Sequence, residues 1–393
     1  MDTPPVDNDA AWLRYRDAWD LQNGIVYLNH GSFGLPPKVV QQARRAWMHR
    51  LEANPVDFFF RAWEPLLLET RIALASLVGT TPENLICVEN ATYGMNIVAN
   101  SIPLQPGDEV LLTDHEYGAV SRIWEQICQQ KRIPAPVITT LPLPVANTSD
   151  VIDVMESAIT ARTRLIVLSH ITSPTAMTLP VSEICQLAEQ HGIMTCIDGP
   201  HAVAQVPLEL DKLGCDFYTA SCHKWLSASF GSGFLFVHPR QQHLVQPVVT
   251  SWGSLLEKER QQWFDEFHWL GTRDPTPFLT ILPAIAFLES VGWEAFRSRT
   301  RYLAEQARKR ISEVTGREPL TPDDGAWYTS MGHIPLGPHC PDNLQDRLWK
   351  ECSIEVPIIR FGGQQFVRVS CHLYTTCAEI DLLVNALAKR LSR

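Results

Sequence analysis

The sequence predicts an α/β fold, with a large, mostly parallel sheet followed by a smaller C-terminal α+β domain. From about residue 60 onward, short apolar runs alternate with segments of helical spacing. Strands separated by helices of roughly 10 to 15 residues are typical of a parallel sheet that helices cover on both faces. At 393 residues, the chain is long enough for two domains and a large buried core.

Six short apolar runs are the candidate strands of the large sheet. In chain order they are Leu85–Val88, Glu109–Thr113, Thr163–Ser169, Met194–Asp198, Phe217–Ala220 and Gly233–Val237. Between them, Val151–Ala161 and Val181–His191 have helical spacing. Ligands of such sheets bind beyond the carboxyl ends of the strands, where Asp198 lies. Polar residues follow three other strands at the same edge: Asn90, Asp114 and Ser221.

A long, charged helical pattern leads into the C-terminal part of the chain. It starts near Pro283, passes Gly292 and runs to about Thr315. Two helices and two strands are expected after it: Asp342–Cys352, Cys377–Leu391, Ile354–Ile359 and Gln365–Ser370. We therefore predict that residues 1–290 form an N-terminal segment and the large domain, and that residues 291–393 form the small domain.

Composition and charge exclude several classes of protein. The formal net charge of −10, without a run of Lys and Arg, argues against a nucleic-acid surface. The acidic segment Met1–Asp9 lacks the basic and apolar regions of a signal peptide. No stretch approaches the roughly 18 consecutive apolar residues of a membrane span. We therefore expect a cytoplasmic protein that binds neither nucleic acid nor a membrane.

The ten cysteines are scattered along the chain and form no CxxC pair. Most lie in apolar surroundings, as in Leu85–Val88 and Met194–Ile197. This pattern favours buried free thiols over a disulfide framework or a metal site.

Lys224 and Asp198 are the most informative pair in the sequence. Each lies at or just beyond the end of an apolar, strand-like segment. This is the pair that a pyridoxal 5'-phosphate enzyme needs, because the lysine forms an imine with the cofactor aldehyde and the carboxylate keeps the ring nitrogen protonated. The sequence therefore predicts an enzyme and this cofactor.

Two segments can hold the cofactor's phosphate. Ser221 and His223 flank the lysine, and in an extended segment their side chains share one face while Lys224 points to the other. The segment Glu89–Asn96 follows a strand and opens a helix, whose backbone N–H groups and Thr92 hydroxyl can bind a phosphate. Plain helix capping by Asn90 or Thr92 is the alternative interpretation.

An aromatic side chain after the strand Glu109–Thr113 can stack on the cofactor ring. Tyr117 and His115 both qualify, and we favour Tyr117.

Arg368 is a charged residue within an apolar strand of the small domain. An inward-facing arginine needs an anionic partner, and its planar fork suits the α-carboxylate of a substrate. The alternative is a structural ion pair with Asp381 or Glu379. Arg360 is a further candidate, for a second acidic group on the substrate.

Together these residues resemble the isopenicillin N epimerase-like branch of the class V aminotransferases, which are cysteine desulfurase-like, fold-type I pyridoxal phosphate enzymes. The resemblance runs from about residue 25 to the C-terminus. The strings that carry it are Leu28-Asn-His-Gly-Ser-Phe-Gly34, Asn54-Pro-Val-Asp-Phe58, Asp114-His-Glu-Tyr117, Asp198-Gly-Pro-His-Ala202, Cys215-Asp-Phe-Tyr218, His223-Lys-Trp-Leu226, Ser251-Trp252 and Gly271-Thr-Arg-Asp274.

The resemblance implies a role for each matching residue. Lys224 would be the Schiff-base lysine, Asp198 the partner of the ring nitrogen, and His201 a contact of the phenolic oxygen. Gly271 and Thr272 would reach the phosphate of a partner subunit, so that a homodimer completes the site. The phosphate would be held by Ala91, Thr92, Tyr93, Ser221 and His223, and the substrate by Ser32, Ser173 and Arg368.

One departure from the cysteine desulfurases is informative. Those enzymes carry a nucleophilic cysteine before the strand that bears the arginine, whereas here the interval Arg360–Gln365 has none. Cys352 precedes the strand Ile354–Ile359 and is not expected to reach the substrate. Ser173 also stands where desulfurases have an asparagine beside the ring. Persulfide-forming chemistry is therefore not expected.

The resemblance favours an epimerase or racemase that acts on an amino acid or an amino-acid-containing peptide. In every candidate reaction the freed Lys224 takes the α-proton. Return of a proton from the opposite face, with Tyr117 or His115 as the acid, gives epimerisation. A C–S lyase and an aminotransferase are the alternatives, and a non-catalytic protein of this fold is a third.

Overall fold

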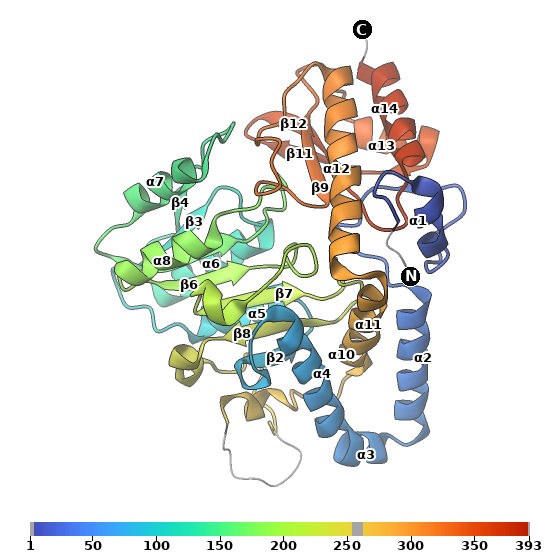
Figure 1. Ribbon diagram of the computed structural model, residues 1–393. Coiled ribbons are helices and arrows are strands. Elements are labelled where there is room, and N and C mark those ends of the chain that lie inside the picture. The colour runs from blue at the N-terminus through green and yellow to red at the C-terminus, as the bar shows by residue number, and fades with distance from the viewer. Residues whose placement is uncertain (1–3, 254–261, 392–393) are drawn as a thin grey trace.

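The computed structural model describes residues 4–253 and 262–391 (Figure 1). A seven-stranded sheet forms the centre of the large domain. Its order is β2 (Leu85–Val88), β8 (Gly233–Val237), β7 (Phe217–Ser221), β6 (Met194–Asp198), β5 (Thr163–Ser169), β3 (Glu109–Thr113) and β4 (Val137–Thr139). β8 runs antiparallel to both of its neighbours, β2 and β7. The predicted fold class and all six predicted strands are confirmed. β7 is one residue longer than expected, and the three-residue edge strand β4 was missed.

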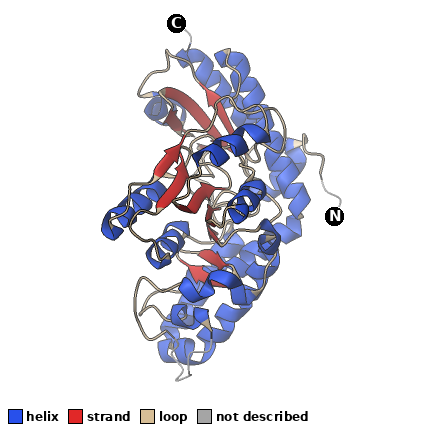
Figure 2. Cartoon of the chain, turned by 90° about the vertical axis from the view of Figure 1, so that its left-hand side faces the viewer, coloured by secondary structure: helices blue, strands red, loops and turns tan. Residues whose placement is uncertain are grey.

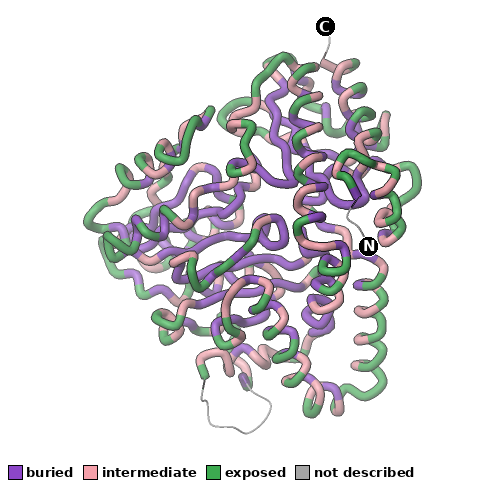
Figure 3. Tube along the Cα trace, in the orientation of Figure 1, coloured by how far each residue is buried: buried purple, intermediate pink, exposed green. Residues whose placement is uncertain are grey.

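Helices cover both faces of this sheet, as Figure 2 shows. Along β5, Leu165 and Val167 pack with α5 (Ala91–Ser101) and α6 (Gly118–Lys131) on one face. Ile166 and Leu168 alternate with them and pack on the other face. That face is covered by α4 (Trp63–Val78), α7 (Thr148–Ala158), α8 (Val181–Gln190) and α11 (Ile281–Val291). Both faces are therefore buried, which explains why the strands are almost uniformly apolar (Figure 3).

α7 begins and ends three residues before the predicted range Val151–Ala161. Asn147 and Asp150 form a capping box, in which each side chain accepts a hydrogen bond from the other's backbone N–H. This box starts the helix at Thr148. Ile159 is extended and ends it.

The N-terminal segment contains elements that the sequence did not predict. They are α1 (Asp9–Arg16), β1 (Val26–Tyr27), α2 (Lys38–Ala53), α3 (Pro55–Asp57), a π-helical turn (Phe58–Ala62) and α4. The remaining short helices are α9 (Leu210–Leu213), α10 (Thr276–Leu279) and three 3-10 turns at Pro82–Asn84, Pro239–Leu244 and Trp263–Phe267.

The long helical pattern across Gly292 is two helices, α11 and α12 (Trp293–Thr315), which meet at an angle of 80°. Gly292 adopts a φ of 93°, which glycine reaches without steric cost, so the chain turns there.

Within the described residues, no single helix is long and apolar enough to cross a membrane, and only the bent pair α10–α11 with α12 passes that test jointly.

The C-terminal part contains an antiparallel sheet of order β11 (Ile358–Phe361), β12 (Gln364–Ser370), β9 (Met331–Pro335). It is packed against α12 and accompanied by α13 (Leu344–Cys352) and α14 (Cys377–Leu391). The predicted strand Ile354–Ile359 is interrupted at Pro357, which has no N–H to donate. Its first half, β10 (Ile354–Glu355), pairs instead with β1 in parallel.

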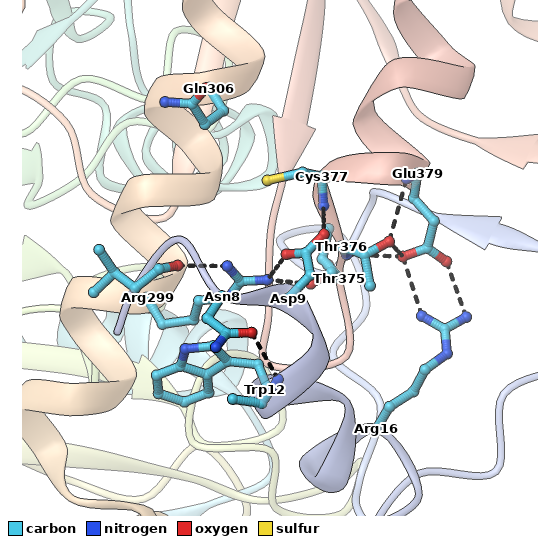
Figure 4. Close-up of polar contacts among 12 residues, drawn as sticks. Asn8, Asp9, Trp12, Arg16, Arg299, Gln306, Thr375, Thr376, Cys377 and Glu379 are labelled. Carbon is cyan, nitrogen blue, oxygen red and sulfur yellow. Dashed lines mark hydrogen bonds and ion pairs between the residues drawn. The ribbon is translucent and has the colours of Figure 1, made fainter. Parts of the chain in front are cut away.

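Buried polar contacts tie the N-terminal helix α1 to α12 and to the start of α14 (Figure 4). The Arg299 guanidinium pairs with Asp9, whose other carboxylate oxygen accepts a hydrogen bond from the Cys377 N–H at 2.7 Å. Arg16 pairs with Glu379 at 2.9 Å and also donates to the Tyr374 carbonyl. The first helix is therefore fixed on the small domain by charge.

Candidate active site

Asp198 and Lys224 lie at the carboxyl edge of two adjacent parallel strands. Asp198 ends β6, and Lys224 follows β7, whose Thr219 is the register partner of Asp198. Burial raises the pKa of Asp198, which the Lys224 amine opposes. Burial lowers the pKa of Lys224 to about 8, opposed by Asp198 and assisted by the Arg368 cation. The amine is thus neutral far more readily than an exposed lysine.

His201 holds the Lys224 amine. Its Nε2 is 3.1 Å from Lys224 Nζ, and its Nδ1 accepts a hydrogen bond from the Trp225 indole N–H at 3.1 Å. Burial and the nearby cations hold the pKa of His201 well below its usual range, so the ring is neutral. With Nδ1 as an acceptor, the proton lies on Nε2, which donates to the neutral amine. The same N–H can donate to the cofactor's phenolic oxygen, the contact that the family resemblance implies for His201.

The predicted phosphate residues meet at the start of α5. The Ala91 N–H donates to Ser221 Oγ at 3.0 Å, which brings the two predicted segments together. Asn90 caps the helix by accepting from the Tyr93 N–H at 2.9 Å, so the capping interpretation also holds for that residue. A Cβ at Gly233 would lie 2.5 Å from Ala220 O and 3.1 Å from Asn90 Cα, so glycine allows this close approach. Thr92 is exposed beside the group.

Of the three predicted substrate residues, Arg368 contacts both of the others, Ser32 and Ser173. Arg368 donates to Ser173 O at 2.6 Å, to Ser173 Oγ at 3.1 Å and to Ser32 Oγ at 2.7 Å. Its side chain is 3% exposed, and burial lowers its pKa to about 10. Among the described residues, no carboxylate pairs with it. The two structural partners considered from the sequence are engaged elsewhere, Asp381 with Arg310 and Glu379 with Arg16.

The two candidates for stacking on the cofactor ring differ in exposure. Tyr117 precedes α6 and is 50% exposed. His115 is buried, lies 4.5 Å from the Phe361 ring and bonds Asp114 through Nδ1 at 2.7 Å. Its Nε2 has no partner among the described residues. The choice of Tyr117 stays a prediction, but His115 is the one buried between the two domains.

Gly271 and Thr272 lie on a loop before α10. A Cβ at Gly271 would meet no atom within 4 Å, and Thr272 is exposed. Their assigned contact with a partner subunit stays a prediction. Arg360 is also exposed and pairs with Asp342 at 2.7 Å.

Sequence reasoning missed Glu116, although it lies within the string Asp114-His-Glu-Tyr117. Its carboxyl accepts hydrogen bonds from Thr113 Oγ1 at 2.6 Å and Ser169 Oγ at 2.7 Å. Burial, reinforced by Asp198, raises its pKa to about 8. A glutamate three residues after the end of a buried strand was the available signal.

His30 was missed as well. Its ring bonds the Lys224 carbonyl at 3.0 Å and the Tyr374 hydroxyl at 2.8 Å. Since a carbonyl only accepts, His30 Nε2 donates to it and Nδ1 accepts from Tyr374. Gly34 lets this segment approach, because a Cβ there would lie 2.5 Å from Lys224 O. The string Leu28–Gly34 was noted for the resemblance, but its contact with the lysine backbone depends on the fold.

A comparison with known families decides the assignment: the model of the aminotransferase class V family matches residues 26–383. The chain belongs to this family. It is 35% identical to an isopenicillin N epimerase of Amycolatopsis lactamdurans, over 98% of this chain and 99% of the relative. It is 30% identical to a putative L-cysteine desulfhydrase of Oryza sativa subsp. japonica, over 93% and 83% of the two chains.

A solved structure supports the fold. A mutant of C-DES with glycine covalently linked to its PLP cofactor has a TM-score of 0.79 and 24% identity to this chain. The similarity covers 94% of this chain and 97% of that one. The protein is thus a pyridoxal phosphate-dependent enzyme of fold type I.

The residues present fit this cofactor. A half-buried lysine with a readily neutralised amine lies beside a buried carboxylate. Among the residues predicted to bind the cofactor's phosphate, His223 has a buried Nδ1 without a partner among the described residues. This is expected for a group that hydrogen-bonds to a ligand.

Proposed function

We propose that this enzyme is an epimerase or racemase that acts at the α-carbon of an amino acid or of an amino-acid-containing peptide. The observation that carries the proposal is Arg368, a buried cation that has no carboxylate partner in the described part of the chain and whose charge helps to lower the pKa of Lys224. A substrate carboxylate on Arg368 would bring its α-carbon towards that base. The 35% identity to an isopenicillin N epimerase over nearly the whole chain supports the reaction class.

Each residue has a chemical task in this proposal. When bound, pyridoxal phosphate supplies the electron sink that makes the α-proton acidic. Asp198 keeps a negative charge at the ring end of the site, and His201 orients the Lys224 amine, which takes the proton. Epimerisation also needs an acid on the opposite face. His115, with its unpartnered Nε2, and Tyr117 are the two candidates for that acid.

A C–S lyase is the second candidate function. The desulfhydrase relative at 30% identity favours it, and elimination of a thiolate needs only Lys224 as base. The Cys352 sulfur, at the end of α13, is engaged by Arg390 at 3.1 Å. A nucleophilic role for Cys352 is therefore not part of either proposal. An aminotransferase remains the third alternative.

We also propose a cytoplasmic homodimer whose loops at Gly271 and Thr272 complete the partner's site. Large apolar side chains near the lysine segment support an interface, since Phe33 is 63% exposed and Phe230 is 44% exposed. All ten cysteines are free thiols, which supports a reducing compartment.

Proton NMR in D₂O separates the reactions. The loaded protein is incubated with alanine, cysteine, cystine and an N-acylated aminoadipyl-cysteine peptide. Loss of the α-proton signal with an intact carbon skeleton supports the epimerase or racemase, whereas pyruvate from a sulfur substrate makes the protein a C–S lyase. A protein that gains no visible absorbance with pyridoxal phosphate, or whose absorbance survives Lys224→Ala, would overturn both.

A further inference from the structure

One face of the small-domain sheet borders the active site. β12 and β9 are antiparallel, with Arg368 opposite His333 and Ser370 opposite Met331. Val367, Val369 and Ile334 alternate with these residues and lie in the small-domain core. Arg368, His333 and Ser370 therefore share the opposite face. A Cβ at Gly31 would lie 2.8 Å from Ser370 Oγ and 3.5 Å from His201 Cε1, which places this face beside the lysine's partner.

Polar atoms on this face are buried and unpartnered. His333 is 3% exposed, and neither of its ring nitrogens has a hydrogen-bond partner among the described residues. Arg368 Nε and Ser370 Oγ are likewise without partners. A single unpartnered atom is uncommon in a protein interior, because burial without a hydrogen bond costs free energy. Four such atoms on three adjacent residues indicate a ligand.

The His333 ring is held in a defined orientation. It stacks on Phe366 with ring centroids 4.1 Å apart and an angle of 20° between the planes. Burial, with the Arg368 cation nearby, keeps the pKa of His333 well below its usual range. The neutral ring therefore offers one N–H donor beside the arginine. A donor and a cation together select an anionic acceptor.

We propose that His333 is a substrate-binding residue that donates a hydrogen bond to the same carboxylate that pairs with Arg368. The proposal rests on the proposed function, because it assumes that an amino-acid carboxylate occupies this face. The carboxylate would then accept from three donors, two N–H groups of the Arg368 guanidinium and one of His333. The β12–β9 register is what places His333 opposite Arg368. The competing explanation is that His333 only fills space against Phe366.

Variants of the loaded enzyme separate these explanations. His333→Leu keeps the bulk and removes the donor, whereas His333→Gln restores an N–H. The rate of α-proton exchange in D₂O is measured with alanine and with alaninamide, which lacks the carboxylate. We expect His333→Leu to raise KM for alanine roughly tenfold with little change in kcat, and His333→Gln to recover most of the loss. An equal effect on alaninamide, or no recovery with Gln, would mean a purely structural role.

A titration of the cofactor-free protein tests the site independently of any reaction. Sodium propionate is added to protein with ¹⁵N-labelled histidine, and the His333 signal is identified by its loss in His333→Gln. We expect a saturable shift of this signal that Arg368→Met abolishes, while the exposed His191 does not respond. If the enzyme exchanges α-protons but the His333 signal does not shift, the proposal for His333 is overturned and the proposed function is not. If the signal shifts but the protein exchanges no α-protons, His333 still binds a carboxylate and the proposed function is overturned.

Discussion

Two buried arginines, Arg299 and Arg368, show the difference between a charge that holds the fold and a charge kept for a ligand. Their exposed fractions are 0% and 3%. Arg299, on α12, pairs with the Asp9 carboxylate and donates to the carbonyls of Val6 and Thr375. Within residues 4–253 and 262–391, the guanidinium of Arg368, on β12, hydrogen-bonds only to two serines, through their hydroxyls and one carbonyl.

The difference has a physical consequence. A buried cation is costly unless an opposite charge compensates it. Arg299 has that compensation within the chain, so its contacts stabilise the folded state. Arg368 lacks a carboxylate among the described residues, so its burial weakens the fold until an anion binds. The same residue type thus serves structure in one place and recognition in the other.

The largest effect is expected from Arg368→Met. Loss of the cation that is predicted to pair with the substrate carboxylate should lower kcat/KM for an amino acid at least roughly 100-fold. The urea midpoint of the cofactor-free protein should stay the same or rise, because an uncompensated buried charge is removed. Steady-state kinetics and urea unfolding measure both. A marked loss of stability would show that Arg368 is structural, like Arg299.

Arg299→Met should give the reverse pattern. It leaves Asp9 without its cation, and we expect the free energy of unfolding to fall by about 2 kcal/mol. The estimate lies below the roughly 3–5 kcal/mol expected for a fully buried pair, because the Asp9 side chain is 28% exposed. Urea unfolding measures the loss, and kcat/KM at a temperature where the variant is folded should change less than threefold. A kinetic effect as large as that of Arg368→Met would remove the distinction.

The charge of Arg368 should also be detectable through Lys224. The lysine must be neutral to react, and its pKa is lowered to about 8. The rate at which cofactor-free protein captures pyridoxal phosphate should therefore rise about tenfold per pH unit below pH 8 and level off above it.

Removal of the Arg368 cation favours the protonated amine and raises the lysine pKa. In Arg368→Met the same profile should move to higher pH, whereas in Arg299→Met it should not move. Stopped-flow absorbance gives both curves. An unchanged midpoint in Arg368→Met would show that the Arg368 charge does not contribute to the lysine pKa.

The sequence was sufficient for six of the seven strands of the large sheet and for the Lys224–Asp198 edge, because a strand buried on both faces is an uninterrupted apolar run that ends at a polar residue. It was insufficient where one residue redirects the chain, as Gly292 and Pro357 do. β9 was missed because Gly332 and Pro335 weaken its strand pattern. The neighbours of Arg368 come from three distant segments, so the contacts of Ser32 and Ser173 depended on a family resemblance, and the position of His333 depended on β-sheet register.

The smallest effect, and the most direct test of the comparison, is the coupling between each arginine and its partner. Asp9 accepts from Arg299 with one oxygen and from the Cys377 N–H with the other. Asp9→Asn leaves the buried Arg299 without an opposite charge, so we expect a loss in the free energy of unfolding at least as large as in Arg299→Met, about 2 kcal/mol. The double variant with Arg299→Met should lose less than the sum of the two single variants, because both remove the same ion pair. The matching cycle of Ser32→Ala with Arg368→Met should show weaker coupling, since Ser32 accepts one hydrogen bond from the guanidinium but does not compensate its charge. Strong coupling in that second cycle would mean that Ser32 stabilises Arg368 in the free protein, and that the substrate carboxylate must compete with it.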